Sequence, residues 1–108
     1  MKRIKEYKNE DGEYHRVDGP AVEYSDGTKS WYLNGKRHRT DGPAVEWDDG
    51  TKEWFLNGER HRTDGPAVEW HNGSKEWCLN GEFLIETEYL KATAYLRCSV
   101  GKLIYNKE

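Results

Sequence analysis

The chain has 108 residues, with 17 basic and 20 acidic side chains and a formal net charge of −3. Apolar residues make up 34% of it, so an ordinary enzyme core is hard to build, and the slightly acidic balance argues against general nucleic-acid binding. No apolar run reaches membrane-spanning length, and two cysteines make no disulfide framework. Because the first residues contain no apolar stretch, we expect no signal peptide. We therefore expect a soluble, cytoplasmic protein with reduced thiols.

A 23-residue unit occurs three times in succession and dominates the sequence. Neighbouring copies are identical at 17 of 23 positions, which excludes chance. A degenerate half-unit precedes them, because Gly12 and His15 stand one period before Gly35 and His38. A repeat of this length predicts stacked structural units that bury their apolar side chains against their neighbours. We expect one domain over residues 1–108, made of a half-repeat at 1–15, three repeats at 16–84 and a C-terminal cap at 85–108.

The unit over residues 39–61 contains its own turn signals. Residues 41–43 read Asp-Gly-Pro and predict a turn, and residues 44–47 form a short predicted strand. Asp49-Gly50 predicts a hairpin turn, residues 52–56 a second strand and Asn57-Gly58 another tight turn. Gly recurs too often for a helix to propagate. The predicted fold is therefore all-β, a meander of stacked antiparallel β-hairpins.

Period-two alternation divides each predicted strand into two faces. In the second strand of the middle unit, Trp54 and Leu56 share the core side, which leaves Phe55 on the opposite, open side. The same assignment places Tyr32 on the open side of the first unit. The predicted core rows are Val22, Val45 and Val68; Tyr24, Trp47 and Trp70; Trp31, Trp54 and Trp77; and Leu33, Leu56 and Leu79.

The segment after the repeats predicts a helical cap. Thr87 can cap a helix from Glu88 to about Arg97, and a short strand is expected at residues 102–105. A terminal repeat needs cover for its open edge, which favours a cap; the alternative is a helix that binds a partner or forms a dimer. The predicted packed face of the helix contains Tyr89, Ala92 and Leu96, with Leu90 and Ala94 beside them.

The phrase W-x-L-N-G-x-x-H-R-x-D-G-P-A-V-E-W-x-x-G-[TS]-K-x-W resembles the MORN repeat, over residues 7–84. It is closer to the bacterial and phage variant that carries NGxxHRxDGPA, some members of which are described as antitoxin-like. The resemblance implies an elongated, curved sheet of consecutive hairpins and a role in macromolecular interaction. One departure is that arginine follows the histidine, at Arg16, Arg39 and Arg62, where ordinary MORN units have glycine.

Repeated polar side chains offer no asymmetric catalytic constellation. His38 and Asp41, with their counterparts, have zinc-ligand chemistry, but a turn element explains them better. In that interpretation the aspartate makes an Asx-type backbone bond near the proline, and the histidine packs on a tryptophan of the next unit. Glu46 and its counterparts are expected to face solvent and pair with cross-strand lysines such as Lys52. We predict no catalysis, no metal and no cofactor.

Positions that differ between the units are the candidates for recognition, because a ligand need not share the repeat period. Exposed aromatics framed by carboxylates resemble an interface patch, although such rings can also simply shield the sheet. The predicted partner-binding residues are Tyr32, Phe55, Asp48, Glu53 and Glu76.

The predicted function is therefore binding. We expect a small bacterial or phage inhibitor, antitoxin-like, that blocks a toxin, nuclease or defence complex by protein contact. Its acidic face would occupy a basic nucleic-acid-binding cleft, without direct nucleic-acid or membrane binding. The alternatives are a binder of a small nucleotide-like ligand between aromatic rows, and a passive MORN-type scaffold. Oligomers through a sheet edge or the C-terminal helix are compatible with the pattern.

Overall fold

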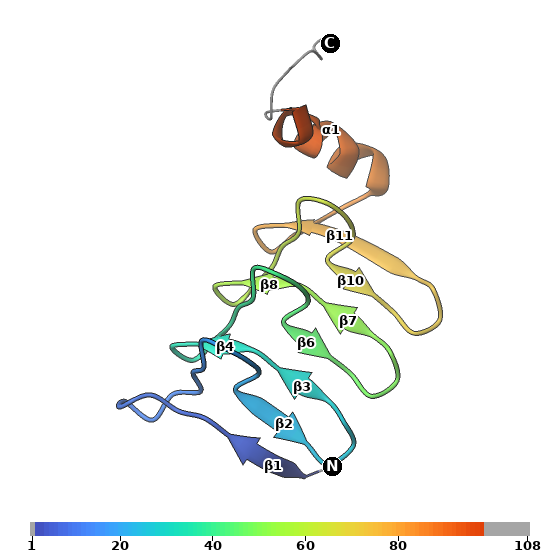
Figure 1. Cartoon of the computed structure of the whole chain (residues 1–108). Coiled ribbons are helices and arrows are strands. Elements are labelled where there is room, and N and C mark those ends of the chain that lie inside the picture. Colours follow the sequence, from blue (N-terminus) through green and yellow to red (C-terminus); the bar gives the residue numbers. More distant parts are fainter. Residues whose placement is uncertain (1, 99–108) are drawn as a thin grey trace.

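The computed structural model describes residues 2–98, and the side chains of residues 95–98 are outside that description. Short antiparallel strands follow one another through the repeats, and one helix, α1 (Glu86–Cys98), ends the described chain (Figure 1). The predicted all-β meander with a C-terminal helical cap is confirmed. The strands are β1 (Arg3–Glu6), β2 (Val22–Tyr24), β3 (Lys29–Ser30), β4 (Tyr32–Leu33), β5 (Lys36–Arg37), β6 (Val45–Glu46), β7 (Lys52–Glu53), β8 (Phe55–Leu56), β9 (Glu59–Arg60), β10 (Val68–Glu69), β11 (Lys75–Leu79) and β12 (Glu82–Leu84).

Two kinds of tight turn connect the strands, as the Asn-Gly and Asp-Gly pairs predict. At Asn57-Gly58 both residues have positive φ, 52° and 85°, the geometry of the two-residue hairpin turn that suits the twist of a β-ribbon. At Asp49-Gly50 the aspartate Oδ1 accepts a hydrogen bond of 2.9 Å from the N–H of Thr51, and the glycine φ is 94°. The aspartate thus fixes this turn by an Asx-type bond.

A break at the repeated tryptophan divides the second predicted strand in the first two units, whereas β11 continues through Trp77 in the third. Of the expected strand 52–56, β7 belongs to the eight-stranded sheet, whereas β8 pairs with β9 in a separate hairpin. At this break, the N–H of Trp54 donates to the carbonyl of Ala67, and its own carbonyl accepts from the N–H of His61. The alternation of faces continues through the break, with Glu53 and Phe55 buried and Trp54 and Leu56 half-buried on the opposite face.

The core therefore differs from the predicted one. The valine row is fully buried as expected, but Trp31 and Trp54 are only half-buried, while Phe55 retains 8% exposure and Cys78 3%. The strand register explains the exchange, because Val45 pairs with Glu53 and therefore shares its face with Glu53 and Phe55, whereas Trp54 lies on the other face. The buried apolar residues are Ala21, Val22, Ala44, Val45, Phe55, Ala67, Val68, Cys78 and Tyr89, joined by the polar Thr28, Ser30, Thr51, Glu53 and Thr93.

Polar side chains that recur in each unit connect that unit to the next. The Nδ1 atom of His38 accepts a hydrogen bond of 2.9 Å from the N–H of Asn57, in the turn of the following unit, and His15 and His61 repeat this contact 19 residues apart. The histidine therefore holds a turn through a hydrogen bond, and its predicted packing on a tryptophan stays a prediction. At the Asp-Gly turns, the Thr28 hydroxyl accepts a hydrogen bond from the N–H of Asp48 in the next unit.

Helix α1 begins two residues before the predicted start. The carbonyl of Ile85 accepts the first helical hydrogen bond, from the N–H of Tyr89, so Thr87 lies inside the first turn and is not the cap. The packed side contains Tyr89 and Thr93, both buried, whereas Ala92 is exposed, contrary to the predicted face. The helix packs on β11 and β12 and so covers the last hairpin. The side chain of Leu96 and the expected strand at 102–105 lie outside the described residues.

Candidate binding clefts

The predicted interface residues do not form one exposed patch. Phe55 and Glu53 are buried, with 8% and 6% exposure, so their predicted exposure was wrong. Asp48 lies on the surface at a turn, while Tyr32 and Glu76 are half-buried. The strand register explains the error, since the pairing of Val45 with Glu53 puts Glu53 and Phe55 on the buried valine side.

The two glutamates of the predicted patch instead accept hydrogen bonds from indole groups. Glu53 accepts a hydrogen bond of 2.7 Å from Nε1 of Trp47 and one of 3.1 Å from Nη2 of Arg60, and Glu76 accepts 3.0 Å from Nε1 of Trp70. The sequence carries a signal for this pairing, because the two positions change together. The first unit has tyrosine at the indole position and serine at the carboxylate position, whereas the later units have tryptophan and glutamate. In the first unit, Ser30 stands in place of this glutamate, and the buried Nε of Arg37 has no hydrogen-bond partner among the described residues.

The arginine that follows each histidine organises the loop after it. Nε of Arg39 donates to Asp41 at 2.8 Å, and Nη1 donates to the carbonyl of Pro43 at 3.0 Å and to Glu46 at 3.2 Å. The guanidinium lies 3.9 Å from the ring centre of Trp31, a cation–π contact. These bonds correct two predictions: the aspartate pairs with arginine and makes no Asx bond, and the glutamate pairs with arginine and not with lysine.

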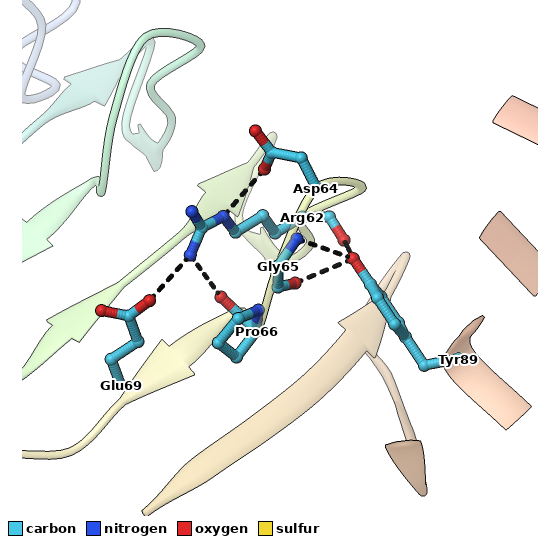
Figure 2. Close-up of polar contacts among 6 residues, drawn as sticks. All are labelled: Arg62, Asp64, Gly65, Pro66, Glu69 and Tyr89. Carbon is cyan, nitrogen blue, oxygen red and sulfur yellow. Dashed lines mark hydrogen bonds and ion pairs between the residues drawn. The ribbon is translucent and has the colours of Figure 1, made fainter. Parts of the chain in front are cut away.

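The third unit repeats this arrangement in detail. Arg62 bonds Asp64, the carbonyl of Pro66 and Glu69, as Figure 2 shows, and it lies 3.8 Å from the ring of Trp54. The glycine of each loop is required by this packing. A Cβ atom at Gly65 would meet the guanidinium carbon at 2.8 Å, closer than real side chains approach.

Two open clefts lie on the tryptophan face, each between the arginine loops of successive units. The first cleft, of about 590 Å³, separates loop 16–19 from loop 39–41 and is lined between them by Trp31, Leu33 and His38. The second, of about 510 Å³, separates loop 39–42 from loop 62–64 and is lined by the equivalent Trp54, Leu56 and His61. Arg39, Thr40 and Asp41 line both clefts.

Sequence reasoning missed these clefts because it placed the tryptophans in the core. Each combines a half-buried indole with a guanidinium, a carboxylate, a threonine hydroxyl and the polar backbone of a glycine loop. Such a set can hold an aromatic or polar group but contains no nucleophile paired with a base. In the described part of the chain, no group of three His, Cys, Asp or Glu side chains could hold a metal ion. No described helix has the length and apolar character needed to cross a membrane.

The loop carboxylates predict how stability depends on pH. The bond from Arg39 holds the pKa of Asp41 below its ordinary 3.8, and the N–H of Thr51 does the same for the pKa of Asp49. Folding thus favours the ionised carboxylates, so their contribution is fully present above about pH 3.8 and is lost as the pH falls through the lower folded-state values. We expect the urea midpoint to fall between pH 6 and pH 3, and the change to be smaller in Asp41→Asn than in the control Asp48→Asn. An equal change in both variants would contradict this assignment.

Comparison of the chain with protein-family models, with curated proteins and with solved structures gives no match. The resemblance of its motif to the MORN repeat therefore stays a prediction. What the chain does has to be inferred from the two clefts.

Proposed function

We propose that the chain is a non-catalytic binding protein that holds a macromolecular partner, a protein in the first place, along the tryptophan face. The observation that carries this proposal is the pair of clefts, which have equivalent linings in neighbouring units. Each unit adds two strands to the sheet, and strands lie about 4.8 Å apart, so equivalent points are about 10 Å apart. A partner segment that crosses successive units can use both clefts at once.

The chemistry of the clefts favours a protein partner. Tryptophan and arginine are the residues most often found at the energetic centres of protein interfaces, and here each Arg39-type guanidinium is held rigidly by several bonds. A rigid surface loses little side-chain entropy on binding. Repetition of the same groups in the same environment argues against catalysis, which normally needs unlike groups in unlike environments.

The inhibitory, antitoxin-like role rests on the motif alone and remains part of the proposal. Its targets would be a toxin, a nuclease or a defence complex. The expectation of a basic partner cleft loses its support, because Glu53 and Glu76 are occupied by indole groups.

A second candidate function is supported by the size of the clefts. Volumes of about 510 and 590 Å³ fall within the range of small-molecule sites, and several polar groups converge in each cleft. A small ligand would use one cleft, whereas an extended partner would use both.

Blocking both clefts with one substitution tests the proposal. Thr40 is exposed and lines both clefts, so Thr40→Trp fills them while Arg39 and Asp41 keep their bonds. The matched control is Asp48→Trp, at an exposed turn outside the clefts. A partner captured by the tagged chain from a bacterial lysate and then purified should bind Thr40→Trp at least tenfold more weakly than it binds the control.

The same titration separates the alternatives. Equal affinity of wild type and Thr40→Trp would exclude the clefts as the interface. Loss of binding in Asp48→Trp alone would move the interface to the turn at Asp48, one of the residues that the sequence predicts to bind a partner. If the wild-type chain captures a small molecule that Thr40→Trp does not bind, the result would favour the second function.

A further inference from the structure

A third site of the same kind is filled by a side chain of the protein itself. The hydroxyl of Tyr89, from α1, lies 2.5 Å from the carbonyl oxygen of Arg62 and 2.8 Å from that of Gly65, and it accepts a hydrogen bond of 3.2 Å from the N–H of Gly65 (Figure 2). Its ring packs against Trp77, with the ring centres 6.3 Å apart and the planes tilted by 53°. A phenol is thus bound between the last arginine loop and the last tryptophan.

The residues that hold Tyr89 have exact counterparts one and two repeats earlier. The residues 23 positions before Arg62, Gly65 and Trp77 line the second cleft. The residues two repeats before them line the first cleft. These counterparts are Arg39, Gly42 and Trp54 in the second cleft, and Arg16, Gly19 and Trp31 in the first.

In the open clefts the equivalent polar atoms have no partner within the described chain. Among residues 2–98, the N–H of Gly42 donates no hydrogen bond and the carbonyl oxygen of Arg39 accepts none, and the same holds for Gly19 and Arg16. At the third site, the corresponding atoms all bond the Tyr89 hydroxyl. One hydroxyl can therefore satisfy in each cleft the donor and acceptor that it satisfies at the third site.

The clefts also have room for the ring. A cavity of about 150 Å³ is enough for a benzene ring, and both clefts are several times larger. The second cleft has Arg62 at the position where the third site has Ile85. The Arg62 guanidinium is held by Asp64 and Glu69 and covers one face of the Trp54 ring, so it forms a wall of the cleft and the cleft volume lies beside the indole.

We infer that each open cleft binds a phenolic ring in the manner of Tyr89, with its hydroxyl at the arginine carbonyl and the glycine N–H and its ring beside the tryptophan. This rests on the proposed function and names the partner chemistry: a protein segment that presents tyrosine side chains. A polyproline II segment places residues i and i+3 on the same side about 9.3 Å apart, close to the spacing of about 10 Å between the clefts. The matching sequence is Tyr-x-x-Tyr in an extended, proline-rich stretch.

Small aromatic probes test the phenol site directly. In ¹H–¹⁵N spectra of the full chain, 4-methylphenol should shift the amide signals of Gly19 and Gly42, whereas toluene at the same concentration should shift them much less. The amide of Gly65 is the internal control, because Tyr89 already occupies it. Thr40→Trp, checked for folding by the same spectrum, should remove the shifts at both glycines.

Peptides then test the spacing. A proline-rich peptide with Tyr-Pro-Pro-Tyr should bind at least tenfold more tightly than the same peptide with Phe-Pro-Pro-Phe, and more tightly than one with a single tyrosine. Equal shifts by toluene and 4-methylphenol, or no shift at either glycine, would overturn the inference. The proposed function would survive that result if a captured partner still loses affinity for Thr40→Trp, so the two failures can be told apart.

Discussion

Replacing Phe55 with alanine is expected to lower the free energy of unfolding by about 3–5 kcal/mol, the usual cost of truncating a buried aromatic ring. The ring belongs to the central core cluster with Ala44 and Val45, and little of it reaches solvent. Because small domains are stable by only about 5–15 kcal/mol, the variant should unfold at much lower urea concentration. Urea titration followed by tryptophan fluorescence measures the change.

Trp54→Ala is the informative comparison. The indole is half-buried, with the Arg62 guanidinium on one face and the second cleft beside it, so its loss creates less internal cavity than the loss of Phe55. We expect a smaller decrease in unfolding free energy than for Phe55→Ala. A larger decrease would mean that the tryptophan face, and not the phenylalanine face, is the core.

Tyr89→Ala should have a comparably large effect, of about 3–5 kcal/mol, but confined to the docking of α1. The side chain is 1% exposed and supplies both the ring on Trp77 and the hydroxyl on the Arg62–Gly65 loop. Hydrogen exchange should show faster exchange of the helix amides, while those of β6 and β7 keep their protection. The local response follows from the nearest-neighbour contacts of a stacked structure.

Tyr89→Phe separates the two contributions. It retains the ring and removes the hydroxyl, which leaves the N–H of Gly65 without its partner and should cost about 1–3 kcal/mol. If the phenylalanine variant matched wild type, the hydroxyl contacts would add no stability. If it matched alanine, the ring contact would add none.

The architecture could be predicted because its signals are local. The positive φ angles at Asn57-Gly58 follow from the residue types, and the repeat period then places every hairpin. The buried valine row also follows, because period-two alternation holds within β6.

Which face of residues 52–56 is the core could not be predicted in the same way. The run alternates in the structure as it does in the sequence, but the pairing of Val45 with Glu53 puts Glu53 and Phe55 on the buried side, and nothing within those five residues indicates this register. The clefts depend on the tryptophan face being the open one and on loops 23 residues apart, so they emerge only when the units are stacked. The glutamate–indole pair is the exception, because its partners change together between units.

The histidine contact across each junction has a consequence for how such a chain can evolve. Since Nδ1 of His38 bonds the next unit through the same atoms that His61 uses, a duplicated or deleted middle unit meets its neighbours across an unchanged junction. Each added copy would bring one more cleft and raise the valency by one. Binding strength could then be adjusted through avidity, by the number of units rather than by the contacts inside any of them.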